Sequence, residues 1–230
     1  MDYIFLKIGL FLLAYLLGSI PNGLIVGKLF LKIDLREHGS HNIGASNAIR
    51  VMGAKLGFLT LFLDALKAAT VVIVVKYLLP VTLDGFTVTL EIFNHFYDYS
   101  VLFGMAAILG HTFPIFLKFK GGKAVATSLG VVLALTPIPG IICLLVYLIT
   151  VKITHYASLG STFAAISAGV ATFIQLLIQN RLQTDLFMFI IYIALIVFIF
   201  IRHIPNYKRL YHGTERKMSF SKKENDELNK

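Results

Sequence analysis

The sequence has no tryptophan, one cysteine and few charged residues. Charged side chains make up 14% of the 230 residues, whereas hydrophobic ones make up 57%. A soluble domain of this length rarely carries so much apolar sequence, so the composition argues against one. The single cysteine, Cys143, excludes an internal disulfide and gives no information about the redox compartment.

Acidic residues are also scarce, with 12 against 21 lysines and arginines and a net charge of +9. In an apolar chain such an excess has three explanations: cytoplasmic loops of a membrane protein, contact with anionic membrane lipids, or an anionic substrate. Nucleic acid is not expected as a partner, because the basic residues are scattered between apolar runs and form no basic face with interleaved aromatics.

Long apolar runs are plentiful, and runs of roughly 17–25 residues are typical of membrane-spanning helices. Seven segments stand out: 4–30, 56–79, 100–117, 124–136, 138–151, 157–179 and 186–201. The first has no basic region before it and is longer than the apolar core of a signal peptide, so we expect a retained helix. The fourth and fifth are short and are separated by Pro137 and Pro139. They could be two tilted helices, a re-entrant hairpin or one kinked span.

The distribution of basic residues predicts the orientation. Seventeen of the 21 lie in 28–55, 118–123, Lys152 and 202–230, whereas the connection 80–99 has none and carries three acidic residues. By the positive-inside rule, the basic segments face the cytoplasm and 80–99 lies outside. We therefore predict an all-α integral membrane protein with seven transmembrane helices, two of them short, the N-terminus outside and the C-terminus cytoplasmic. Five crossings plus a re-entrant hairpin would give the same orientation.

The chain is predicted to form one membrane-embedded domain, residues 1–217. The polar segment 218–230 offers little to bury, so we expect a disordered cytoplasmic tail. Small residues recur at four-residue spacing inside the spans, as at Gly160 and Ala164, and this spacing favours close helix packing in lipid.

Polar groups are costly in lipid, so their placement is informative. Three polar clusters occur, and the predicted orientation puts all of them on the cytoplasmic side. The first, 34–50, combines two arginines, two serines and two asparagines with two glycines. Arginine presents a planar fork of donors suited to phosphate; the alternative is a plain connecting loop. His38 and His41, without a cysteine or a carboxylate cluster nearby, do not indicate a metal site.

The second cluster is LKFKGGKAVATS, 117–128, followed by an apolar helix. Its spacing is not that of a Walker P-loop. Two adjacent glycines can expose backbone N–H groups, and a helix N-terminus with a lysine in its first turn attracts anions. We therefore expect Lys120, Gly121, Gly122 and Lys123 to bind an anionic group, the alternative being a basic anchor loop.

The third cluster, 202–217, begins where the last apolar run ends. Its basic residues fit a tail bound to anionic lipid, but His203 and Asn206 stand at the mouth of the last span, where a reacting headgroup could lie. Asp64 and Lys67 lie inside the second span, three residues apart, so they share a helix face. A structural ion pair is favoured over a catalytic one.

In this order, the three clusters resemble one bacterial family, the acyl-phosphate:glycerol-3-phosphate acyltransferases (PlsY). Residues 34–50 resemble D-x-R-x-x-G-S-x-N-x-G-[AT]-[ST]-N-x-x-R, and 110–127 resemble G-H-x-F-P-x-F-L-x-F-K-G-G-K-x-V-A-T. Residues 202–217 resemble R-H-x-x-N-x-x-R-L-x-x-G-x-E-x-K. The resemblance covers the chain except about its last dozen residues. Ala68 and Ala124 depart from it, because the family usually has glycine there.

The resemblance implies a reaction. A fatty acyl phosphate would give its acyl group to the sn-1 hydroxyl of glycerol-3-phosphate, yielding lysophosphatidic acid and phosphate for phospholipid biosynthesis. It also implies a seven-helix fold in a bacterial plasma membrane, with the active site facing the cytoplasm. No cofactor, metal, CoA or nucleotide is expected. The expected partners are the two substrates, membrane lipids and, functionally, an enzyme that produces acyl phosphate.

The resemblance also suggests roles. The acyl phosphate would be held by Lys120, Gly121, Gly122 and Lys123, which would neutralise the leaving phosphate. The glycerol-3-phosphate would be held by polar side chains of the first cluster: Arg36, Ser40, Asn42, Ser46 and Arg50. The catalytic set would combine members of all three clusters: Arg36, Ser40, Lys123, His203 and Asn206. Either His203 or the departing phosphate would take the hydroxyl proton. Structural roles are expected for Glu215, paired with a cation, and for Asp64 with Lys67.

Two other classes would also use cations in a helical bundle. A transporter for organic phosphates usually binds its substrate at the membrane midplane between repeats, whereas these clusters lie at one face and no repeat is visible. A CDP-alcohol phosphotransferase needs a metal-binding run of aspartates, and the one Asp-Gly pair here, Asp84-Gly85, lies in the outer connection.

Overall fold

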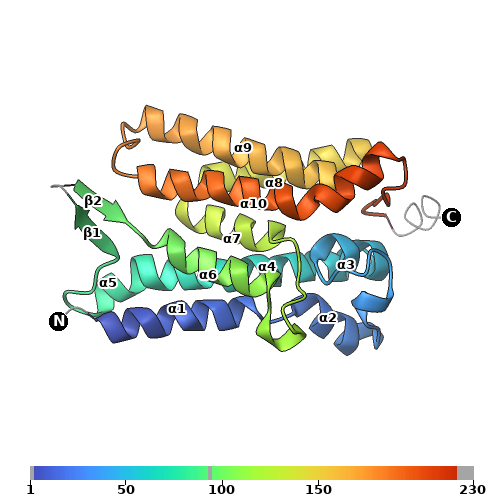
Figure 1. Cartoon of the computed structure of the whole chain (residues 1–230), viewed down its shortest axis with the longest axis horizontal. Coiled ribbons are helices and arrows are strands. Elements are labelled where there is room, and N and C mark those ends of the chain that lie inside the picture. Colours follow the sequence, from blue (N-terminus) through green and yellow to red (C-terminus); the bar gives the residue numbers. More distant parts are fainter. Residues whose placement is uncertain (1–2, 93–94, 222–230) are drawn as a thin grey trace.

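The computed structural model describes residues 3–92 and 95–221 and is almost entirely helical (Figure 1). The α-helices are α1 (Ile4–Gly18), α2 (Asn22–Leu31), α3 (Ala45–Met52), α4 (Ala54–Ile73), α5 (Leu79–Thr82), α6 (Val101–Thr112), α7 (Val125–Leu135), α8 (Pro137–Thr154), α9 (Ala157–Ile178) and α10 (Leu186–Tyr211). The remaining elements are two 3-10 turns (Leu35–Glu37 and Ile115–Leu117), a π-helical turn (Val74–Leu78) and a hairpin of two antiparallel strands, β1 (Thr89–Ile92) and β2 (His95–Asp98).

Helix α7 lies at the centre of the bundle. In Figure 1 it runs between the layer of α8, α9 and α10 and the layer of α1, α4 and α6. Eight of its 11 residues are buried, as expected for a helix that is apolar on every side. Because this short helix is held by both layers, the residues at its ends are fixed relative to the rest of the fold.

Four helical stretches among the described residues are long and apolar enough to cross a membrane: Ala54–Thr82, Pro137–Thr154, Ala157–Ile178 and Leu186–Tyr211. The pair α1 and α2, bent by 42° at the break between them, raises the number to five if it forms one span. Helices α6 and α7 are apolar but shorter. The predicted helical membrane fold is therefore confirmed in outline. Seven crossings, which would require both short helices to cross, remain a prediction.

The structure excludes one of the three alternatives for residues 124–151. The chain turns at Thr136, and Gly140 of α8 then packs against Leu133 of α7. Val125 near the start of α7 and Tyr147 near the end of α8 line the same cavity, so α8 runs back alongside α7 and a single kinked span is excluded. Two tilted helices and a re-entrant hairpin both fit this arrangement. The fifth apolar segment, expected to be short, forms a helix of 18 residues, whereas the third forms one of only 12.

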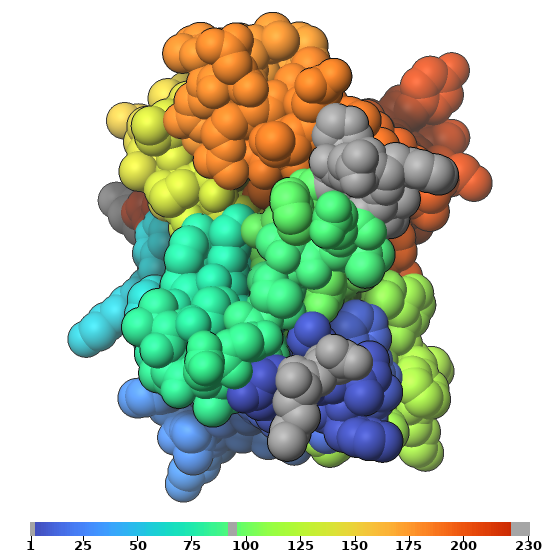
Figure 2. Space-filling view, turned by 90° about the vertical axis from the view of Figure 1, so that its left-hand side faces the viewer, coloured from blue at the N-terminus to red at the C-terminus, as the bar shows by residue number. Residues whose placement is uncertain are grey.

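The two ends of the bundle differ. The start of α1 and the β-hairpin lie at one end, and α3 and the last turn of α10 lie at the other (Figure 1). At the first end, the Tyr3 hydroxyl donates to the Asp84 carbonyl oxygen at 2.8 Å. Figure 2 faces this end, where the hairpin, the start of α1 and the connection between α9 and α10 form the surface. All three polar clusters lie at the opposite end.

The chain remains packed for a few residues after α10, beyond the predicted boundary at residue 217. Met218 is fully buried and packs with Ile49 and Tyr147, and the Phe220 ring stacks on Phe58 with centroids 5.6 Å apart. Residues 218–221 therefore belong to the packed domain. The rest of the predicted tail, 222–230, lies outside the described residues.

Candidate active site

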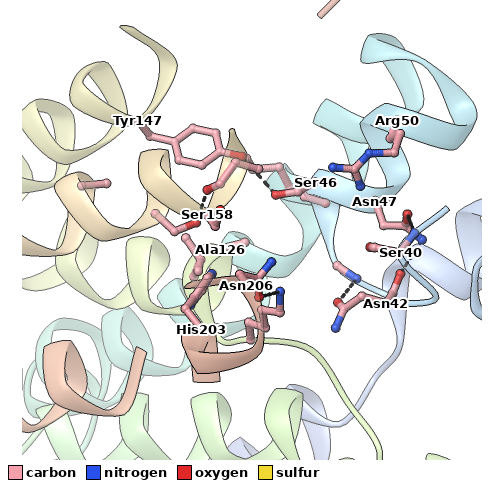
Figure 3. A pocket seen from close by; sticks show the side chains of 18 of the residues that line it. Ser40, Asn42, Ser46, Asn47, Arg50, Ala126, Tyr147, Ser158, His203 and Asn206 are labelled. Atoms are coloured by element: carbon pink, nitrogen blue, oxygen red, sulfur yellow. Dashed lines mark hydrogen bonds between the residues drawn. The ribbon is translucent and has the colours of Figure 1, made fainter. Parts of the chain in front are cut away.

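A cavity of about 400 Å³ opens at the end of the bundle that carries the polar clusters (Figure 3). It lies between α3, α4, α6, α7, α8, α9 and α10, and all three clusters contribute to its wall. The polar and charged side chains of the clusters that line it include Ser40, Asn42, Ser46, Arg50, Lys123, His203, Asn206, Arg209, Glu215 and Arg216. Most of the residues predicted from sequence therefore meet at one place.

Asn47 shapes the first cluster. Its buried side chain accepts the Ser40 N–H at 2.7 Å and donates to the carbonyl oxygens of Leu35, His38 and Asn42. One amide thus folds the loop back on itself, as short polar side chains often do in tight turns. This arrangement puts Ser40 and Asn42 on the cavity wall. Asn47 was not among the predicted site residues.

Helix α3 supplies two further groups. The Ser46 hydroxyl lies 3.0 Å from the Tyr147 hydroxyl of α8, and both face the cavity (Figure 3). Arg50 donates to the carbonyl oxygens of Lys217 and Arg216 at 3.0 and 3.2 Å. A guanidinium has five N–H donors, so others remain for an anion in the cavity.

Lys123 begins a chain of polar contacts across the cavity. Its ammonium donates to Asn206 Oδ1 at 2.6 Å, and Asn206 Nδ2 donates to Glu215 Oε1 at 2.7 Å. Glu215 Oε2 in turn pairs with Arg209 Nε at 2.8 Å, which agrees with the structural role expected for Glu215. Burial lowers the pKa of Lys123 to about 8, so the lysine is mostly charged at neutral pH.

His203 is buried beside this chain, with one ring nitrogen held. His203 Nδ1 lies 2.8 Å from the Ile199 carbonyl oxygen, one helical turn earlier. A carbonyl can only accept, so Nδ1 carries a proton, and in the neutral ring Nε2 keeps a free lone pair. His203 lines the cavity, and its geometry therefore suits a proton acceptor.

An apolar crevice of about 40 Å³ adjoins the cavity between α7, α8, α9 and α10. It shares five residues with the cavity wall: Val125, Leu129, Cys143, Ser161 and Ala164. Beyond them it passes Ala165 and Gly169 of α9 and reaches Tyr192 of α10. The site therefore combines a cationic mouth with a narrow apolar path into the bundle.

A buried ion pair lies at the deep side of the cavity. Lys67 Nζ is 2.9 Å from Asp64 Oδ1, and the two side chains are 7% and 1% exposed. The structural pairing expected for these residues is therefore present. Asp64 itself lines the cavity.

Arg36 does not lie where it was expected. Its guanidinium pairs with Asp34 at 2.6 Å, its side chain is 50% exposed, and it is absent from the described cavity wall. The hydrogen bond from Arg36 holds the pKa of Asp34 at about 2. The structure thus places Arg50, and not Arg36, against the cavity.

The backbone N–H groups of Gly121 and Gly122 are not free, as the expected cradle would require. The Gly121 N–H donates to the Thr112 carbonyl oxygen at 3.1 Å, and the Gly122 N–H donates to that of His111 at 3.0 Å. Both donors are therefore used within the fold. A β-carbon on either glycine would overlap the end of α6, so the pair permits close packing of this loop. Lys120 is exposed and, with both glycines, is missing from the described cavity wall.

Two residues of the facing wall escaped sequence reasoning. Tyr147 of α8 and Ser158 of α9 both reach the cavity (Figure 3). The Ser158 hydroxyl is buried and has no hydrogen-bond partner in the described part of the chain. Both residues sit in apolar runs that carry no local signal of a site.

Comparison with known proteins agrees with this geometry. A family model described as glycerol-3-phosphate acyltransferase matches residues 8–213. The chain belongs to this family. A glycerol-3-phosphate acyltransferase of Acholeplasma laidlawii is 37% identical over 222 residues, covering 92% of this chain and 93% of the relative. One of Staphylococcus aureus (strain N315) is 41% identical over 209 residues, covering 91% and 96%.

Solved structures extend this family relationship to the fold. The integral membrane glycerol 3-phosphate acyltransferase PlsY, in its glycerol 3-phosphate form, superimposes with a TM-score of 0.75 at 34% identity, covering 92% of this chain and 95% of that one. Its lysophosphatidic acid form gives 0.73 at 33% identity, covering 93% and 95%. The predicted PlsY family is confirmed, and the protein is an integral membrane acyltransferase of the glycerol-3-phosphate class.

Proposed function

We propose that the protein transfers a fatty acyl group from acyl phosphate to the sn-1 hydroxyl of glycerol-3-phosphate, giving lysophosphatidic acid and phosphate for phospholipid biosynthesis. The observation that carries this proposal is a cationic cavity that adjoins an apolar crevice, with five wall residues in common. An acyl phosphate has the same two parts, a phosphate and a long alkyl chain. The glycerol 3-phosphate and lysophosphatidic acid forms of PlsY support the acceptor and the product.

The acyl phosphate is assigned to Lys123. The phosphate would lie against the ammonium that Asn206 holds at 2.6 Å, with the alkyl chain directed past Leu129 into the crevice. A fixed positive charge stabilises the negative charge that grows on a leaving phosphate, and such electrostatic stabilisation is usually a large part of catalysis. Gly121 and Gly122 then serve by letting the loop pack closely, not by binding the phosphate through their N–H groups.

Glycerol-3-phosphate is assigned to the wall formed by the first cluster. Arg50 would clamp its phosphate, with Ser40, Asn42 and Ser46 orienting the glycerol. Arg50 replaces Arg36 in this role because Arg36 is exposed and already paired. The two phosphates would thus occupy different walls of one cavity.

His203 is assigned as the base. Its unprotonated Nε2 would take the proton of the sn-1 hydroxyl while the hydroxyl oxygen attacks the acyl carbonyl carbon. The bond between that carbon and the phosphate oxygen then breaks, and the phosphate leaves with the electron pair. An acyl phosphate is already activated, so no covalent enzyme intermediate is needed.

The site is proposed to face the cytoplasm of a bacterial plasma membrane, in a protein that crosses it seven times. The location of three basic clusters at one end of the bundle supports this orientation. In a Cys143→Ser background, Glu91→Cys should react with an impermeant maleimide from outside and Ser221→Cys only after the membrane is opened. Outside labelling of both positions would contradict an odd number of crossings.

The donor is tested with purified protein and labelled glycerol-3-phosphate. We expect lysophosphatidic acid with palmitoyl phosphate and essentially none with palmitoyl-CoA or palmitoyl acyl carrier protein. The reason is that the proposed site provides Lys123 for a phosphate and the crevice for an alkyl chain. The proposal includes no group that would bind the adenosine of CoA or a carrier protein. Turnover with palmitoyl-CoA but not with palmitoyl phosphate would refute acyl phosphate as the acyl donor. In cells, an enzyme that produces acyl phosphate would have to supply the substrate.

A further inference from the structure

The deep side of the cavity contains a buried cluster that the proposed mechanism does not use. Asp64 and Lys67 of α4 and His111 of α6 are 1%, 9% and 4% exposed. Asp64 and His111 line the cavity, whereas Lys67 lies behind them. Buried charges are expensive unless they are paired, so such a cluster beside a reaction site calls for a reason.

Lys67 fixes the protonation of the His111 ring. Its ammonium makes three contacts: Asp64 Oδ1 at 2.9 Å, the Ile20 carbonyl oxygen at 2.9 Å and His111 Nδ1 at 3.1 Å. An ammonium has three N–H donors and cannot accept, so His111 Nδ1 accepts in this contact. Asp64 Oδ1 lies 3.6 Å from the same nitrogen, which is too far for a hydrogen bond from a protonated Nδ1. In a neutral ring the proton is then on Nε2. Asn22 Nδ2, which donates to Asp64 Oδ1 at 3.1 Å, keeps the carboxylate in place.

The protonated nitrogen lies where the substrate is expected. A β-carbon on Gly122 would overlap His111 Nε2, so this nitrogen sits against the residue that precedes Lys123. Within the described residues His111 Nε2 has no hydrogen-bond partner, although its ring lines the cavity. The same loop is held by Arg202, whose Nη2 donates to the Gly122 carbonyl oxygen at 3.0 Å. An unpaired N–H donor thus lies against the residue that precedes Lys123, and His111 and Lys123 both line the same cavity.

We propose that His111 Nε2–H donates a hydrogen bond to the acyl phosphate held at Lys123, and that Lys67, supported by Asp64, acts as a positioning residue that keeps the ring in this tautomer. The inference rests on the proposed acyl-phosphate donor. It also explains the glycine at position 122, because any side chain there would push the ring away from the cavity. A buried ring that served only the packing would be expected to have both nitrogens paired.

Kinetics with matched variants test the contact. His111→Ala should lower kcat/KM for palmitoyl phosphate by about tenfold to a hundredfold, the loss expected for one hydrogen bond to a charged group. His111→Gln, whose amide nitrogen reaches the position of Nε2, should restore at least a third of the decrease in log(kcat/KM) that His111→Ala causes. The KM for glycerol-3-phosphate should stay within about twofold in both, and the exposed control His212→Ala should match the wild type. An unchanged kcat/KM in His111→Ala, or equal losses for both substrates with no recovery in His111→Gln, would overturn the contact.

Nitrogen NMR of histidine-labelled protein tests the tautomer without turnover. The His111 signals, identified by their loss in His111→Ala, should show a bare Nδ1 and a protonated Nε2, and inorganic phosphate should shift Nε2. The double variant Asp64→Asn with Lys67→Met removes both charges and should give a mixture of tautomers. A protonated Nδ1 in the wild type would end the inference while leaving the acyltransferase proposal intact. Failure of the wild type to use palmitoyl phosphate would instead refute the donor, and the NMR result would still stand.

Discussion

Two buried histidines on different sides of the cavity are held in opposite ways. His203 Nδ1 donates to the Ile199 carbonyl oxygen at 2.8 Å, which leaves Nε2 as an acceptor. His111 Nδ1 accepts from Lys67 at 3.1 Å, which leaves Nε2 as a donor. The same side chain is therefore prepared as a base at one place and as a hydrogen-bond donor at the other. The group on Nδ1 decides the chemistry available at Nε2.

The two groups that contact Nδ1 of these histidines are provided in different ways, one by secondary structure and the other by tertiary packing. Ile199 lies four residues before His203, so the α-helix itself supplies the carbonyl. Lys67 lies on another helix and is brought to His111 by packing of α4 and α6. The tautomer of His203 should therefore tolerate changes in neighbouring helices. The hydrogen-bond donor His111 Nε2–H should be lost when either the Asp64–Lys67 ion pair or the Gly121-Gly122 loop is disturbed.

Removing the acceptor nitrogen of His203 should have the largest effect. His203→Asn keeps an amide that can still donate to Ile199 and leaves nothing at the Nε2 position. We expect kcat to fall by about 10²–10⁴-fold, the usual contribution of a general base. Both KM values should change by less than about threefold in steady-state assays. If kcat is retained in a folded variant, the departing phosphate takes the proton and the histidine only shapes the site.

The next largest effect should separate two arginines of the first cluster. Arg50→Ala should lower kcat/KM for glycerol-3-phosphate by about tenfold to 150-fold, the range for a lost hydrogen bond to a charged group. Arg36→Ala should lower it by less than about threefold, because Arg36 is half exposed and paired with Asp34. Equal losses would place the phosphate elsewhere. Kinetics with both substrates varied, after a check of folding by thermal unfolding, decide the matter.

Much of the fold could be predicted from local sequence. Each apolar run became a helix or a bent pair of helices, because hydrophobic length is a local property. Helix ends were harder to predict. α10 continues to Tyr211, ten residues beyond its apolar run, because polar residues after position 201 still pack against the site. The packed segment around Met218 was also missed, since its partners lie on α3 and α8.

Site residues could be predicted where a sequence motif contains them. They could not be predicted where their position depends on tertiary contacts. Arg36 and Arg50 look alike in sequence, and only the pairing with Asp34 separates them. Adjacent glycines predict free N–H groups, but the end of α6 accepts both. Ala124 is a different case, since sequence comparison already marked it as a departure from glycine. Its φ of 68° lies in the left-handed region where glycine is unstrained.

A methyl group at position 122 should displace the hydrogen-bond donor His111 and leave the proposed base His203 in place. Gly122→Ala places a β-carbon on His111 Nε2, so the ring must move. We expect kcat/KM for palmitoyl phosphate to fall by about tenfold, the loss of one hydrogen bond to a charged group, with KM for glycerol-3-phosphate unchanged. Gly9→Ala is the matched control, because a β-carbon there meets nothing within 4 Å. Equal losses for both substrates in Gly122→Ala would point to a general distortion of the cavity.

The smallest effect should come from pH and concerns Lys123, which lines the cavity together with the two histidines. Burial lowers its pKa to about 8, so the ammonium that binds the acyl phosphate is lost as pH rises through about 8. Because kcat/KM reports the free enzyme, this parameter should fall about twofold between pH 7 and pH 8. Monoester phosphates with a second pKa near 6 change little in this range. Lys123→Arg keeps its charge, so its profile should be flat above pH 7 even if its activity is lower. A fall of the same size in Lys123→Arg would assign the high-pH limb to another group.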